Sequence, residues 1–212
     1  MSTDTPPARP NRRAVQTAQT RREILQAARR CFAASGYAGT SLKDVAAQAG
    51  VSVQTIYDSV GSKADLVGGL NDLVDEEAQI FELIVEVAGV TNPVEIASLP
   101  ARITHRLMER SGDIIRVAMH GMHADPALAP AVMEGDRRHR EGTEMVANRL
   151  SELGQLRAGL DVADAARTIA SLADILMAII LIDQHGLDLD QVEAWMIDTI
   201  IRSVLSADPL TR

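Results

Sequence analysis

Apolar residues recur at intervals of three and four along most of the chain, the spacing that places side chains on one face of an α-helix. The pattern is short from Leu42 to Ala49, short again around Ile56, and much longer after Lys63. No stretch shows the apolar–polar alternation of a half-buried strand, and the sequence has no internal repeat and no glycine-rich phosphate loop. We therefore predict an all-α fold.

Start and stop signals divide the first part of this pattern. Ser41 and Ser62 each stand three residues before an aspartate, as in a capping box, so each marks the start of a predicted helix. Gly50 is placed to end the first helix in a left-handed cap, and Ser52 is placed to cap a second helix over 53–59. Two short helices joined by a tight turn are typical of a DNA-reading helix-turn-helix.

The remaining chain predicts six helices, and the last two have more apolar surface than one chain can cover. Their expected ranges are 62 to about 87, 93–110 with a kink or fresh start at Pro100, 113 to about 122 after Gly112, 130–153, a helix that begins at Asp161, and 189–205. The segment Leu172–Ile182 is apolar on every side except at Asp174, so it must be covered all round. The last helix has a stripe made of Val192, Trp195, Met196, Thr199, Ile200 and Ser203. We expect these two helices to pair with their copies across a two-fold axis, which makes the protein a homodimer.

Charge is distributed unevenly along the chain. The formal net charge is −8, yet the segment up to Lys63 has nine Lys/Arg against four Asp/Glu, whereas the rest has twelve against twenty-five. A basic head on an acidic body suits a protein whose head meets phosphates. One cysteine permits no internal disulfide. We expect that no apolar run approaches the ~18 residues of a membrane span and that the amino terminus has no signal-peptide apolar core. We expect a soluble cytoplasmic protein without a membrane partner.

Residues 1–19 are rich in Ser, Thr, Pro and Arg and offer almost nothing to bury, so we expect a disordered basic tail and a first helix from Thr20. Two interpretations of this tail stay open. Arg9, Arg12 and Arg13 are suited to an arm that reaches phosphates or a minor groove, and they are equally compatible with a solvated tail.

The segments TRREILQAARRCFAASGYAGTS and IYDSVGSKADL, with the helix-turn-helix between them, resemble the amino-terminal domain of the tetracycline-repressor (TetR) family of transcriptional regulators. The resemblance rests on Gly36-Tyr37 at the end of the first helix, Tyr57 late in the recognition helix and Lys63 at the start of the fourth. It implies a three-helix DNA-binding head over 20–66 and a six-helix ligand-binding and dimerisation body over 67–212. The implied function is a ligand-responsive regulator, most often a repressor released from its operator by a small molecule.

The recognition helix is expected to read double-stranded operator DNA. Gln54 can pair bidentately with adenine, whereas Tyr57 and Lys63 suit phosphate oxygens. Asp58 either accepts a hydrogen bond from a cytosine amino group or faces away from DNA. The residues expected to contact DNA are Thr40, Ser41, Lys43, Ser52, Val53, Gln54, Thr55, Tyr57 and Lys63.

The predicted body has methionines that could line an aliphatic ligand cavity or simply fill a core. Asp174 is a carboxylate in an apolar run, so it needs either an arginine across the dimer or a polar group of a ligand. The ligand-binding residues that we predict are Ile103, Leu107, Met145, Asp174 and Met177.

Other chemistry has little support in the sequence. His120 and His123, with Asp125 and His139, resemble a metal site, but the two histidines flank a probable helix end and no fourth ligand has a fixed spacing. We predict no metal and no cofactor. Nucleophile-elbow, Walker-type and acid–base signatures are absent, so we predict no enzyme. The alternative function is a helical interaction protein whose helix-turn-helix has lost DNA binding, and an all-α enzyme comes third.

Overall fold

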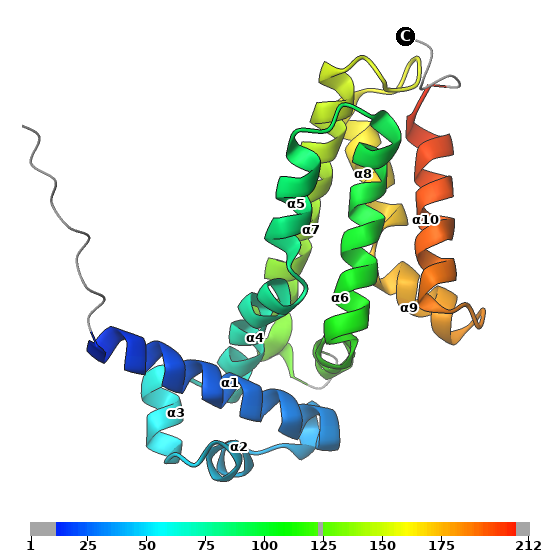
Figure 1. Ribbon diagram of the computed structural model, residues 1–212. Helices are drawn as coiled ribbons and strands as arrows, with labels where there is room; N and C mark the ends of the chain where they lie inside the picture. Colours follow the sequence, from blue (N-terminus) through cyan, green and yellow to red (C-terminus); the bar gives the residue numbers. More distant parts are fainter. Residues whose placement is uncertain (1–11, 123–124, 207–212) are drawn as a thin grey trace, which may run out of the picture.

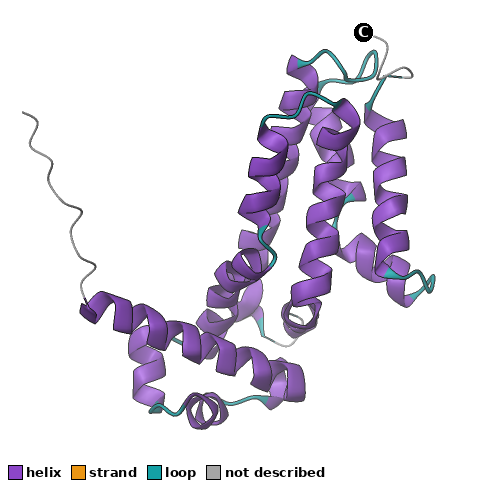
Figure 2. Cartoon of the chain, viewed as in Figure 1, coloured by secondary structure: helices purple, strands orange, loops and turns teal. Residues whose placement is uncertain are grey.

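The computed structural model describes residues 12–122 and 125–206, and these residues form helices without strands (Figures 1 and 2). The predicted all-α fold is therefore confirmed. The elements are α1 Arg12–Gly39, α2 Leu42–Ala49, α3 Val53–Ser59, α4 Lys63–Glu77, α5 Ile80–Ala88, α6 Pro93–Gly121, the 3₁₀ helix η1 Pro126–Leu128, α7 Ala129–Glu152, α8 Val162–Leu172, α9 Ile175–Asp183 and α10 Leu189–Val204.

Two hydrophobic cores organise these helices. The head core surrounds Phe32 and Ile56, which are fully buried, and it brings α1, α2 and α3 together. The body core surrounds Leu150 and Ile169 between α6, α7, α8 and α10. α4 and the carboxyl end of α6 also pack into the head core, through Leu66 and Ile114 respectively. Figure 1 shows the head lying across the end of the elongated body.

The first helix begins at Arg12 rather than at Thr20, so residues 12–19 are helical instead of disordered. All eight residues are exposed, and local bonds support them: the Thr17 hydroxyl donates to the Arg13 carbonyl at 2.9 Å, and the amide of Gln19 donates to Glu23 at 2.8 Å. The prediction was wrong here because it required burial, whereas continuation of an existing helix needs none. Residues 1–11, which include Arg9, lie outside the described part of the chain.

The helix predicted from 62 to about 87 is divided at Gln79, whose φ of 52° is left-handed. The change of direction has a packing reason: Leu66 belongs to the head core, whereas Leu83 belongs to the body core. For α6 the sequence predicted two helices, 93–110 and 113 to about 122, but the structure has one. α6 runs unbroken through Pro100 and Gly112. Pro100 is buried there, and a glycine inside a helix costs only about 1 kcal/mol, which tertiary packing can offset.

The apolar helix predicted from Asp161 is divided at Asp174, which has an extended backbone and caps α9 by accepting a hydrogen bond from the Leu176 amide at 2.7 Å. The buried Thr104 hydroxyl on α6 donates to the carbonyl of Ala173 at 2.6 Å, so the polar groups at this break are satisfied. The sequence predicted that Asp174 needs an arginine across the dimer or a polar group of a ligand. In the structure, the partner of its carboxylate is instead the Leu176 amide.

By length and composition alone, Val162–Asp183 is apolar enough to cross a membrane, with a mean hydropathy of 2.0, so the expectation that no run would come near a span was wrong. In the structure, this segment is broken at Asp174 and packs as α8 and α9 against α6, α7 and α10.

The predicted stripe on α10 lies on two faces of the helix. Val192, Met196 and Ile200 are buried in the chain's own core, with exposures of 2%, 1% and 0%. Trp195 faces outward and is 37% exposed. Only the outer face is therefore available to a second chain.

Candidate DNA interface

The helix-turn-helix is fixed by the local signals that predicted it. Ser41 and Asp44 form a complete capping box at the start of α2. Gly50 ends this helix with φ 69° and ψ 30°, a left-handed conformation that an L side chain would strain. Ser52 then caps α3 by accepting a hydrogen bond from the Thr55 amide at 3.0 Å. These caps set the angle between α2 and α3 before any partner is present.

α3 has one face in the head core and one face in solvent. Ile56 is fully buried and Val53 packs partly against the core, so the helix cannot rotate about its axis. Gln54 and Tyr57 are exposed, and 53% of Tyr57 is accessible. A large aromatic ring held in solvent beside a glutamine suits contact with a groove rather than with the core.

Asp58 accepts a hydrogen bond from the amide of Gln54 at 2.8 Å, one helical turn away. Sequence analysis considered only whether Asp58 faces DNA, and it did not predict this contact within α3. It orients the glutamine in the protein without DNA, leaving the amide oxygen of Gln54 to accept from a base.

The predicted polar contacts around α2 divide into accessible and inaccessible residues. Ser41, Lys43 and Ser52 are exposed, although both serines already serve as caps. Thr55 is half-buried, and its hydroxyl lies 2.8 Å from that of Ser52. Thr40, by contrast, is buried inside the head.

Thr40 is 4% exposed, and its hydroxyl donates to the carbonyls of Gly36 and Cys31 at 2.8 and 3.1 Å. The Thr40 side chain therefore ties the link between α1 and α2 to the end of α1, and it is buried in the protein without DNA. Cys31 is half-buried, and burial raises the pKa of its thiol, as expected of a packing residue rather than a reactive one.

Lys63, the first residue of α4, lies where the head meets the body. Its Nζ is 4.2 Å from the centre of the Tyr37 ring, and the Tyr37 hydroxyl donates to Asp125 at 2.7 Å. Burial and this hydrogen bond raise the pKa of Tyr37, while the Tyr37 hydroxyl and the Ala127 amide lower the pKa of Asp125. Sequence reasoning missed this junction, because 88 residues separate Tyr37 from Asp125.

Arginines on α1 hold the recognition helix and the body. Arg21 donates to the carbonyl of Ser59 at 3.0 Å, so a cation sits at the carboxyl end of α3, where the helix dipole favours it. Arg29 pairs with Asp113 on α6 at 2.8 Å. A movement of α6 would therefore be transmitted directly to α1.

α4 is also tied to α7. Arg138 contacts Asp72 and Asp75 on α4 at 2.9 and 2.5 Å, and Glu134 on its own helix at 2.8 Å. The guanidinium groups of Arg137 and Arg138 lower the pKa of Glu134 to about 2. Ion pairs therefore attach α4, the helix that begins with Lys63, to α7.

The five predicted ligand residues lie in different parts of the body. Ile103 and Met177 are half-buried against the body core, and Leu107 packs against the head core. Asp174 caps α9, and Met145 lies on the outside of α7 with 56% exposure. Two open clefts lie along α1, and none of the five residues lines them.

Among residues 12–122 and 125–206, no three His, Cys, Asp or Glu side chains gather as a metal site would require. His123, one of the two histidines in the motif considered above, lies outside the described residues.

Comparison with known proteins relates both the head and the body to bacterial regulators. Residues 24–70 match the family model of the bacterial regulatory proteins, tetR family. No curated protein matches the chain. The structural matches extend over the body as well as the head.

Three solved structures illustrate the likeness. SmeT, the repressor of the multidrug efflux pump SmeDEF of Stenotrophomonas maltophilia, in its complex with triclosan, is 20% identical over 91% of this chain and 95% of that chain, with a TM-score of 0.71. NalD, the secondary repressor of the MexAB-OprM multidrug efflux pump in Pseudomonas aeruginosa, is 21% identical over 90% and 98%, with a TM-score of 0.67. FadR from Bacillus subtilis in complex with stearoyl-CoA is 19% identical over 85% and 97%, with a TM-score of 0.68. The amino-terminal head thus matches the family model of the bacterial regulatory proteins, tetR family, over residues 24–70, and the chain shares the all-α fold of these solved regulators over most of its length.

Proposed function

We propose that the protein is a transcriptional repressor that binds operator DNA as a homodimer and releases it when a small molecule binds the body. The observation that carries this proposal is the exposed face of α3, where Gln54 and Tyr57 stand on a helix fixed by Ile56 and by its cap at Ser52. Lys63, the first residue of α4, adds a cation four residues after the end of α3. The protein acts in the cytoplasm, without a catalytic or membrane role.

The relatives support both halves of the proposal. SmeT and NalD are repressors of efflux pumps, and SmeT and FadR have been solved with small molecules bound. An effector that separated the two heads would prevent α3 of each subunit from entering successive major grooves.

Dimerisation is proposed through the outer faces of α9 and α10. Leu176 and Ile180 on α9 are 49% and 38% exposed, and Trp195 on α10 is 37% exposed. Burial of these three side chains against their copies is supported by the apolar character of the whole α9 segment, which one chain leaves partly uncovered. Because α10 also packs against α6, a dimer formed here would connect to the helix that reaches the head.

The effector site is proposed between α6 and α9, where Ile103, Leu107 and Met177 face the two cores and Asp174 begins α9. A ligand there would separate helices that now touch, and it would act on α1 through Arg29 and Asp113. Met145 is set apart from this site by its exposure on α7.

Genome-wide mapping of DNA bound by the protein tests the proposal and supplies the operator. We expect discrete binding sites with two half-sites one helical turn, or a multiple of a turn, apart. The rival function, a helical interaction protein without DNA binding, predicts no enriched site and no retention of duplex DNA at low salt.

A further inference from the structure

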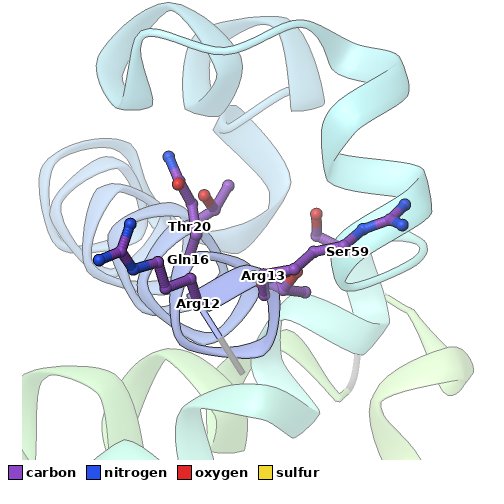
Figure 3. A pocket seen from close by; sticks show the side chains of 6 residues that line it. Arg12, Arg13, Gln16, Thr20 and Ser59 are labelled. Atoms are coloured by element: carbon purple, nitrogen blue, oxygen red, sulfur yellow. Dashed lines mark hydrogen bonds between the residues drawn. The ribbon is translucent and has the colours of Figure 1, made fainter. Parts of the chain in front are cut away.

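The exposed start of α1 forms an open cleft of about 390 Å³ with the end of the recognition helix (Figure 3). The residues that line it are Arg12, Arg13, Gln16, Thr17, Thr20 and Ser59. Figure 3 shows the Arg12 and Arg13 side chains extending in opposite directions, with Arg13 reaching toward Ser59. The cleft therefore has two guanidinium groups around a floor of amide and hydroxyl groups, and no carboxylate lines it.

These side chains are the donors that bind phosphate oxygens. Guanidinium groups pair with phosphate in a bidentate geometry, and Gln and Thr side chains are common additional donors to the DNA backbone. The lining includes no large apolar side chain, so it offers an uncharged organic molecule little surface to bury. The cleft therefore suits an anion that is itself largely solvated.

The cleft is attached rigidly to the DNA-reading helix. Ser59 is the last residue of α3, and its carbonyl accepts a hydrogen bond from Arg21, which follows the lining residue Thr20 on α1, so a direct bond joins α1 and α3 beside the cleft. Figure 1 shows that the start of α1 lies on the side of the head away from α9 and α10. In a dimer formed through α9 and α10, the two clefts would lie outside the two recognition helices.

We propose that Arg12 and Arg13, supported by Gln16 and Thr17, bind the phosphate backbone of the duplex that flanks each half-site. This inference rests on the proposed function and adds a contact outside the base pairs that α3 reads. It explains why two turns of α1 project beyond the head core although none of residues 12–19 is buried. The contact would strengthen binding to every sequence alike, because a phosphate carries no base identity.

The test compares the wild-type protein with Arg12→Ala/Arg13→Ala on two duplexes at several salt concentrations. One duplex carries the mapped operator with long flanks, and the other ends at the last base pair of the half-sites. If each subunit loses one phosphate, the slope of log K against log salt falls by about 1.8 per dimer, with a loss of affinity of tens-fold at 0.1 M salt. On the short duplex, the variant and the wild type should differ by less than threefold, because the flank is missing.

Two further variants serve as controls. Arg202→Ala removes an exposed arginine at the far end of α10 and should leave the slope unchanged. Arg12→Lys/Arg13→Lys retains the charges and should recover most of the affinity. Circular dichroism should show the same melting temperature for all variants, since these side chains are exposed.

The outcomes separate this inference from the proposed function. If the wild type binds neither duplex, the proposed function itself is wrong. If the wild type binds the operator and Arg12→Ala/Arg13→Ala keeps its slope, only the flanking contact is wrong. If exchanging A·T for G·C pairs in the flanks changes the affinity of the wild type but not of the variant, the arginines read the minor groove, and the backbone assignment is overturned.

Discussion

Trp195→Glu should convert the dimer into a folded monomer. In the single chain, Trp195 is 37% exposed, whereas its neighbour Met196 is 1% exposed, so the substitution alters the outer face of α10 without opening the core. A tryptophan side chain offers up to about 250 Å², so roughly 90 Å² remains for a partner, worth about 2 kcal/mol per subunit at 25 cal/mol per Å². Two copies give about 4–5 kcal/mol, or about a thousandfold in dissociation constant, before the desolvation of the glutamate is counted.

Light scattering over a micromolar concentration range measures this effect directly. The wild type should have twice the chain mass of 22.8 kDa, and Trp195→Glu should have the single mass with an unchanged helical circular dichroism spectrum. Ile200→Glu is the matched comparison: because Ile200 is fully buried, a carboxylate there should unfold the chain. A wild-type mass near 22.8 kDa, or a dimeric Trp195→Glu protein, would refute the assignment of the interface.

Three further substitutions test contacts inside the subunit. Thr104→Val removes the donor to the Ala173 carbonyl at the α8–α9 break, so we expect a loss of about 1–3 kcal/mol, seen as a lower melting temperature, whereas Thr104→Ser should retain most of the stability. Asp174→Ala should cost about 0.5–2 kcal/mol through the lost cap, and Asp174→Asn much less; equal melting temperatures for the two variants would show that the cap contributes nothing. Tyr37→Phe removes the hydrogen bond that is the largest cause of the lowered Asp125 pKa. A carboxyl group whose pKa is lower in the folded state than in the unfolded state stabilises the fold above its unfolded-state pKa. This stabilisation is lost as the pH falls through the folded-state pKa. The gap in melting temperature between wild type and Tyr37→Phe should therefore be present at pH 7 and shrink below about pH 4; a gap that is constant with pH would contradict this reading.

Local chemistry made the head predictable. Ser41, Gly50, Ser52 and Ser62 act on backbone groups within four residues, so their signals do not depend on the rest of the fold. Thr40 looked like another polar residue of this series, but its hydroxyl turns inward to α1, which only the packed head decides.

The body was less predictable because its helix breaks depend on packing between distant segments. Gln79 turns the chain so that α4 and α5 can serve different cores, and no turn signal marks it in the sequence. Pro100 and Gly112 look like breaks, yet packing along α6 overrides both. Asp174 could have been recognised, since an aspartate just before an apolar helical run is an N-cap signal. The apolar residues on both sides of Asp174 conceal this signal, because they read as one continuous helix.

A titration against operator and scrambled duplex at several salt concentrations distinguishes base reading by α3 from backbone contact by Lys63. Gln54→Ala should lower discrimination at one base pair per half-site by about 1–3 kcal/mol with little change in the salt slope. Lys63→Ala should weaken binding to both duplexes alike and lower the slope by roughly one counterion per subunit. If Lys63→Ala altered base preference while Gln54→Ala altered only the salt slope, the docking of this head on DNA described above would be wrong.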